Sequence, residues 1–434
     1  MEPVVVGWII LGSAFVLMFI GVPVFFTFLI TGFVGFWILT GSGPAFGVLG
    51  LVPYSRAHVY ELSVVPLFIL MGNLAAAGGI SHDIFQSVRL WLGNLRGGLA
   101  ITSVAAGALF AACCGSSIAS ATTLGKITIP EMINVGYDRK LSYGSVAAAG
   151  TLAVMIPPST TMVIYGIITD QSIGKLLIAG IFPGLLLATI FVALIFFKVW
   201  KNPSLAPLVA GDASWNTRLR SLKNMWGIVI LVMLVLGGLY AGFFTPTESG
   251  AVGAFGALVL GLAGRRFTWK KLREALLDSS LTAVMLFSII IGSLVFGYQF
   301  GVTRIPTVFT EFLVNSEMPR VFILMGIMFI YIILGFFMDG IAIMFLTLPI
   351  IFPAVVALGY DPIWFGIIVV VNMEISFITP PFALNLFALK SVLPDVTMGE
   401  LGRSIVPFFF MFLLGLALLV VFPQIALFLP GQMT

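Results

Sequence analysis

The chain has 434 residues, of which 60% are hydrophobic and only 9% are charged, and its formal net charge is +4. Soluble domains carry about 25% charged residues, and disordered chains are poor in apolar residues, so this composition excludes both classes. The apolar runs are continuous and approach the ~20 residues that a helix needs to cross a bilayer, whereas barrel strands alternate apolar and polar residues. We therefore predict an all-α polytopic membrane protein, whose basic residues set its orientation and do not bind nucleic acid.

The first 59 residues are expected to form N-terminal scaffold helices. Two apolar runs predict helices over about 4–21 and 23–40, and an irregular stretch with Pro53, Arg56 and His58 follows. The next elements are a helix over about 62–79 and an amphipathic segment over about 80–98.

A first internal unit is expected over residues 60–200. Its run at about 99–134 is too long for one helix and has a small, polar centre, and the basic residues place both of its ends on the cytoplasmic side. We predict a re-entrant helical hairpin with its tip at Gly115–Ser117, since irregular backbone at membrane depth must be buried in protein or face a cavity. The following helix, at about 141–170, must break at Pro157-Pro158, because two prolines remove two amide donors.

The centre of the chain separates this unit from a second apolar half. Residues 201–224 form a polar linker, and central scaffold helices are expected over 225–282, with a basic stretch at 265–273. The positive-inside rule places the linker and the basic stretch in the cytoplasm, and the N-terminus outside.

The second apolar half resembles the first. A shift of 223 residues aligns the Gly-Tyr-Asp of 136–138 with that of 359–361, and the Pro-Pro of 157–158 with that of 380–381. We therefore predict a second unit over 283–428, with a hairpin at about 320–358 and a broken Pro-Pro helix at about 362–391. The charges give the two copies opposite topology, and inverted repeats with interrupted helices are typical of secondary transporters.

The predicted breaks suggest the chemistry of a binding site. A broken helix frees carbonyl oxygens on one side of the break and exposes a new helix N-terminus on the other. Carbonyls and hydroxyls suit a desolvated alkali cation, and the partial positive charge of an N-terminus suits a carboxylate. Such a site binds a cation and an organic anion together without a buried arginine.

Several motifs, in this order, resemble those of one family: VPLFILMGNL at 65–74, GSSIASATTLGKITIPEM at 115–132, GTLAVMIPPSTTMVIYG at 150–166, FTPTESGAVGA at 244–254, GFFMDGIA at 335–342 and ITPPFALNLF at 378–387. The chain resembles the large membrane subunit (DctM-like) of tripartite ATP-independent periplasmic (TRAP) transporters. The resemblance implies an elevator-type importer of organic acids in the bacterial inner membrane, with sodium ions as the coupling ions. It also implies a separate small membrane subunit (DctQ-like) and a periplasmic substrate-binding protein (DctP-like).

The predicted site residues fall into two sets. Asp339 is a candidate cation ligand or a cap bonded to backbone amides, and the same two readings hold for Ser116 and Ser117. Ser159, Thr160 and Asn385 are candidates for substrate contact or for local capping. The predicted sodium-binding residues are Gly115, Ser116, Ser117, Ile156, Gly335, Met338, Asp339 and Thr379, and the predicted substrate-binding residues are Pro158, Ser159, Thr160, Pro381 and Asn385.

Other readings remain open at this point. Glu374 lies near the second break and is a candidate proton or cation site, while Glu248 fits a capping box. An alternative function is a proton- or sodium-coupled anion symporter that works without a periplasmic binding protein. An intramembrane enzyme is disfavoured, because two scattered histidines and two adjacent cysteines offer neither a nucleophile with a base nor a metal cluster.

Overall fold

The computed structural model describes residues 2–57, 59–208, 214–380 and 383–433. Every regular element in this described part is helical, which confirms the predicted all-α fold. Six helices are long and apolar enough to cross a membrane, and eight spans result if each of two bent helix pairs counts as one. The outer faces of these helices carry exposed side chains such as Phe255, Leu281 and Phe410, as expected where lipid is the solvent.

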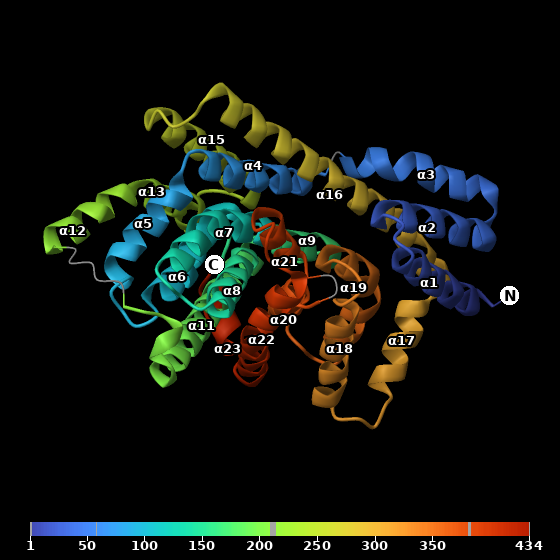
Figure 1. Cartoon of the computed structure of the whole chain (residues 1–434). Helices are drawn as coiled ribbons and strands as arrows, with labels where there is room; N and C mark the ends of the chain where they lie inside the picture. The colour runs from blue at the N-terminus through green and yellow to red at the C-terminus, as the bar shows by residue number, and fades with distance from the viewer. Residues whose placement is uncertain (1, 58, 209–213, 381–382, 434) are drawn as a thin grey trace.

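One layer of the molecule runs along the upper side of Figure 1, where the long helix α16 lies against α2, α3 and α4, and α15 packs on α4. Glycines permit the closest approach in this layer, since a Cβ at Gly32 would meet the backbone of Phe296 in α16. The layer consists of α1 (Pro3–Phe19), α2 (Val24–Thr40), α3 (Ser42–Ala57), α4 (Val64–Ala77), α15 (Pro246–Ala263) and α16 (Trp269–Thr303).

In two places the helices of this layer differ from the ranges expected from the sequence. The stretch after residue 40 was expected to be irregular, but α3 is a helix with Pro53 inside it. Pro53 removes one amide donor and its ring displaces the carbonyl of Leu49, so the cost is confined to the turn before it. Helix α16 is continuous through the expected boundary between residues 282 and 283, so no helix end coincides with that boundary.

The first broken-helix unit packs beneath this layer. Helices α6 and α7 meet at Gly115 and Ser116, and helices α8 and α9 are bent by 42° across the Pro-Pro break. The breaks therefore fall where glycine and proline predicted them. The unit contains α6 (Gly98–Cys114), α7 (Ser117–Asn134), α8 (Arg139–Met155) and α9 (Thr160–Thr169), followed by α10 (Ile173–Ala179) and α11 (Ile181–Lys201).

The second broken-helix unit has helices in the same order as the first, and two of them have the same length as their counterparts. Helices α7 and α19 each have 18 residues, and α8 and α20 each have 17. The unit contains α18 (Arg320–Leu334), α19 (Gly340–Ala357), α20 (Pro362–Ile378) and α21 (Leu384–Val392), and α22 (Met398–Val421) and α23 (Gln424–Leu427) follow.

The repeated Gly-Tyr-Asp motif has the same structural role in both units. Gly136 and Gly359 have φ of +85° and +82°, a conformation that favours glycine, and each follows the end of a helix. Two residues later, Asp138 accepts a hydrogen bond of 2.9 Å from the amide of Leu141, and Asp361 accepts one of 2.9 Å from Trp364. The motif thus ends one helix and caps the next.

Connecting helices join the layer to the two units. Helix α5 (Ile80–Leu92) packs on α6 and α12, and it is amphipathic as predicted. The predicted polar linker contains a helix of its own, α12. The remaining elements are α12 (Trp215–Asn224), α13 (Trp226–Val232), the π-helical turn η3 (Met233–Gly237), α14 (Gly238–Tyr240), α17 (Ile305–Val314) and the short 3-10 helices η1 (Tyr60–Ser63), η2 (Pro203–Leu205) and η4 (Pro430–Gln432).

Candidate functional site

A cavity of about 360 Å³ lies where both broken-helix units meet the layer. The first unit contributes the tip between α6 and α7 and the start of α9, and the second contributes the start of α19 and the end of α20. The layer closes it with α4 and α16. Its lining consists of Ile69, Asn73, Cys114, Gly115, Ser116, Ser117, Ile118, Ala119, Val154, Thr160, Thr161, Asp278, Thr282, Met285, Leu286, Ile341 and Phe377.

The tip between α6 and α7, which form the first helix pair, fits against the break between α8 and α9, which form the first long helix. Gly115 has φ of +60°, and a Cβ there would lie 2.8 Å from the carbonyl oxygen of Pro158. The hydroxyl of Thr160 donates a hydrogen bond of 3.1 Å to the Gly115 carbonyl. Of the predicted site residues, the structure thus brings Gly115, Pro158 and Thr160 together.

Two helix N-termini begin beside this cavity. Ser116 caps α7 by accepting from the amide of Ala119 at 3.4 Å, and Ser159 caps α9 by accepting from Met162 at 3.2 Å. Both serines therefore have the capping role that the sequence left open, and Ser159 is fully buried and outside the lining. Helix N-termini carry partial positive charge, so the start of α9 suits an anion.

The second helix pair is built differently. A Cβ at Gly335 would meet the side chain of Ser376 in α20, so this tip also fits against a long helix. Asp339 caps α19, since its Oδ1 accepts from the amides of Ile341 and Ala342 at 3.0 and 3.1 Å. Thr379 donates to the carbonyl of Ile375 at 2.5 Å.

Several predicted residues do not line the cavity. They are Ile156, Pro158, Ser159, Gly335, Met338, Asp339, Thr379 and Asn385. Ile156 is instead packed against Gly184 of α11. Pro381, which was predicted to contact substrate, lies outside the described residues, and so does His58.

Asn385 connects the two units. It is fully buried at the start of α21, and its amide nitrogen donates a hydrogen bond of 2.6 Å to the hydroxyl of Ser117 at the start of α7. The two residues are 268 positions apart. Asn385 therefore acts on the cavity through Ser117, which lines it.

The substitution Asn385→Ala should lower the free energy of unfolding by about 1–3 kcal/mol, because it leaves the buried Ser117 hydroxyl without its donor. Thermal or denaturant unfolding in detergent measures the loss. Asn372→Ala is the matched control, since Asn372 is equally buried and donates only to Ile368 within α20. If sodium affects the two variants equally, Asn385 has no role at the cavity beyond its contribution to stability.

The oxygen atoms near the tip have the chemistry that a sodium ion requires. The side-chain oxygens of Ser120 and Asn385 are buried and have no hydrogen-bond partner. Hydroxyl, amide and carbonyl oxygens are the ligands that hard cations prefer. Within the described ranges, no three His, Cys, Asp or Glu side chains gather in a way that would hold a transition metal. The donor set fits an alkali cation.

The sequence analysis missed the contribution of the layer to the cavity. Asn73 of α4 donates a hydrogen bond of 2.9 Å to Ser279 of α16, and Asn73, Asp278 and Thr282 all line the cavity. A signal was present, since Asn73 interrupts an apolar helix and Asp278 is the only acid in the run 276–303. The expected boundary at residue 282 had assigned this part of the chain to the scaffold alone.

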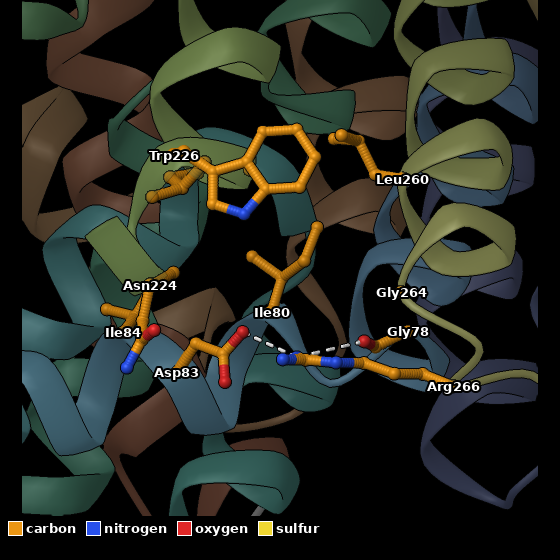
Figure 2. A pocket seen from close by; sticks show the side chains of 11 residues that line it. Gly78, Ile80, Asp83, Ile84, Asn224, Trp226, Leu260, Gly264 and Arg266 are labelled. Carbon is orange, nitrogen blue, oxygen red and sulfur yellow. Dashed lines mark hydrogen bonds and ion pairs between the residues drawn. The ribbon is translucent and has the colours of Figure 1, made fainter. Parts of the chain in front are cut away.

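A second, smaller hollow of about 80 Å³ lies at the start of α5 and is separate from this cavity. Figure 2 shows Arg266 reaching from the α15–α16 connection to Asp83 of α5 and to the carbonyl of Gly78. At the other end of α5, Arg89 forms an ion pair of 2.5 Å with Glu131 of α7. Helix α5 is thus bonded to the layer at one end and to the first unit at the other.

Known proteins similar to this chain are membrane permeases. A family described as "Tripartite ATP-independent periplasmic transporter, DctM component" matches residues 11–425. The C4-dicarboxylate TRAP transporter large permease protein DctM of Pseudomonas aeruginosa is 36% identical over 397 residues, which cover 91% of this chain and 92% of that protein. The isethionate TRAP transporter permease protein DctMQ of Oleidesulfovibrio alaskensis is 31% identical over 405 residues, covering 91% of this chain and 62% of that protein.

A solved structure has a similar fold. The crystal structure of the YdaH transporter of Alcanivorax borkumensis superimposes with a TM-score of 0.60 and 15% sequence identity. The match covers 88% of this chain and 89% of that one. At this identity the likeness concerns the fold alone.

Proposed function

Because the chain belongs to the family of DctM components of tripartite ATP-independent periplasmic transporters, we propose that it imports an organic acid together with sodium ions. The chain is the large permease component of such a transporter and not an enzyme. The observation that carries the sodium and organic-acid proposal is the cavity beside which α7 and α9 begin, together with the unpartnered oxygens of Ser120, next to the lining residue Ala119, and of Asn385, which is bonded to the lining residue Ser117. The helix N-termini suit a carboxylate and the oxygens suit a hard cation.

The proposed sodium ligands are found at the tip of the first helix pair. Gly115, Ser116 and Ser117 offer carbonyl and hydroxyl oxygens there. The amide nitrogen of Asn385 donates to Ser117, which leaves the Asn385 side-chain oxygen nearby without a partner. Thr160 and Thr161 at the start of α9 would contact the substrate carboxylate. Asp339 and Thr379 are proposed for a second ion at the corresponding place in the second unit.

The proposed mechanism is an elevator in the bacterial inner membrane. The two broken-helix units would move as one body against the layer of α1–α4, α15 and α16, which is contacted across the cavity by α6, α9 and α19. The N-terminus would be periplasmic, as the basic residues of the linker and of 265–273 favour.

TRAP transporters work with a periplasmic binding protein and a small membrane subunit. For this chain we propose that the small subunit is a separate polypeptide, whereas the isethionate relative carries the fused name DctMQ. The binding protein would deliver the organic acid. Relatives at similar identity are named for C4-dicarboxylate and for isethionate, so identity alone does not select the substrate.

Sodium should stabilise the purified protein specifically. A ligand that binds only the folded state adds RT ln(1 + [L]/Kd), so sodium at 100 times its Kd adds about 2.7 kcal/mol. Thermal unfolding in sodium is compared with unfolding in potassium or choline at equal ionic strength. Ser116→Ala should abolish the difference between the salts.

The matched control for this test is Ser172→Ala. Ser172 caps α10 through a hydrogen bond of 3.4 Å to the amide of Lys175, the same length as the Ser116 cap, and it lies away from the cavity. It should lower stability in all salts equally and leave the sodium effect unchanged. Equal unfolding midpoints of the unmodified protein in sodium, potassium and choline would contradict sodium coupling.

A further inference from the structure

Glu374 of α20 is a buried acid that the proposed sodium and substrate sites do not use. Its side chain is fully buried, and neither carboxylate oxygen has a hydrogen-bond partner. An ionised carboxylate is not tolerated in an apolar interior unless it is paired, and ionisable groups inside membrane-spanning segments mark functional sites by default.

The neighbours of Glu374 along its own side of α20 are apolar. Helical spacing places Ile367, Val370 and Ile378 on its side of α20, and all three are fully buried. A sodium ion needs several oxygen ligands, which these side chains do not offer. A neutral carboxyl group needs none of them.

No charged side chain in the described part of the chain compensates Glu374. The helices packed on α20 are α8, α9, α10, α18, α19, α21, α22 and α23. Their charged residues lie near helix ends and are exposed or half-buried, and none forms a bond to Glu374: Arg139, Lys140, Lys175, Arg320, Lys390, Glu400 and Arg403.

The remaining titratable groups on these helices have other partners or lie elsewhere. Tyr165 of α9 donates to the carbonyl of Pro362, and Tyr331 of α18 pairs with Thr347. Asp339 caps α19 through two backbone amides. Tyr143 of α8 is buried and forms no hydrogen bond to Glu374.

We propose that Glu374 is a proton-binding site, occupied in this conformation, whose proton holds α20 in its packed position between the two units. This proposal rests on the proposed transport function. Within that function, it makes the packed state of the moving body depend on pH as well as on sodium. Loss of the proton would place an unpaired charge in the apolar contact around α20 and favour its opening.

The first test is the infrared spectrum of the purified full chain at pH 8. The unmodified protein should show the carbonyl stretch of a neutral carboxylic acid, and Glu374→Gln should lack it. Glu311→Gln makes the same chemical change at an exposed position of α17 and should retain the band. Asp339→Asn removes another acid of the second unit and should also leave the band in place. An identical spectrum in the unmodified protein and Glu374→Gln overturns the proposal.

The second test is thermal or denaturant unfolding between pH 6 and 9. Glu374 releases its proton on unfolding, so the unfolded state binds fewer protons and stability falls as pH rises. The unfolding equilibrium constant of the unmodified protein should rise by up to tenfold per pH unit relative to Glu374→Gln. Parallel pH profiles for the two proteins overturn the proposal.

The two proposals fail in different ways. If Glu374→Gln does not fold, Glu374→Asp keeps the acid and should shift the infrared band without abolishing it. A neutral-acid band without any sodium effect on stability contradicts the proposed sodium coupling and leaves the proton site intact. A sodium effect on stability without the neutral-acid band contradicts the proton site and leaves the proposed sodium coupling intact.

Discussion

Substitution of Gly115 by alanine should abolish the sodium effect on stability and lower the stability itself. Gly115 has φ of +60°, a region that costs an L-residue about 1–2 kcal/mol. In addition, its new Cβ would lie 2.8 Å from the Pro158 carbonyl oxygen, a distance that real Cβ atoms do not reach, so the tip must move away from the break. The movement would separate the oxygens proposed to bind sodium.

Gly242→Ala separates the two effects of this substitution. Gly242 has φ of +72°, and nothing lies within 4 Å of the Cβ position. It should show the backbone cost of about 1–2 kcal/mol alone and retain the full sodium effect. Unfolding of both variants in sodium and in potassium gives the comparison. If Gly115→Ala loses no more stability than Gly242→Ala and still responds to sodium, the fit between the tip and the break is unimportant.

Two substitutions of Asp339 should distinguish a capping role of this residue from a role in cation binding. Asp339→Ala removes the acceptor of the Ile341 and Ala342 amides and should cost about 1 kcal/mol. Asp339→Asn keeps a good capping side chain and should cost only a few tenths of that. Both should weaken the stabilisation by sodium, since both remove the negative charge.

The control for Asp339 is Asp361→Ala in the same unit. Asp361 is exposed and caps α20 through a bond of 2.9 Å to the amide of Trp364, so its loss should cost stability in all salts without changing the sodium effect. A full sodium effect in Asp339→Asn would leave Asp339 with the capping role alone, which is one of the two readings that the sequence left open.

The breaks in the helices could be predicted from the sequence because they depend on local chemistry. Gly115 adopts a backbone conformation that other residues avoid, and Pro157-Pro158 cannot continue a helix. The same holds for the caps, since Asp138 and Asp361 act within three residues of themselves. The second set of breaks was predicted because the Gly-Tyr-Asp and Pro-Pro motifs have the same spacing in both halves of the chain.

Features that depend on distant parts of the chain could not be predicted. The hydrogen bond between Asn385 and Ser117 joins the two units, and no local sequence pattern predicts it. The start of α16 was missed because the run 265–273 is charged, although Thr268 caps this helix and its first turns are simply polar. The stretch that contains Pro53 was expected to be irregular, whereas α3 includes this proline in its C-terminal half.

The absence of basic side chains from the cavity has an electrical consequence. Among the described residues of its lining there is no Lys, Arg or His, and Asp278 adds a negative charge. Under the proposed function, a bound carboxylate would be balanced by helix N-termini and by the sodium ions that bind with it. One cation per carboxylate makes a neutral load, and each further cation adds an elementary charge, on which a membrane potential of 100 mV does about 2.3 kcal/mol of work. In a cavity without arginine, the proposed coupling ions would therefore both hold the anion and draw on the membrane potential.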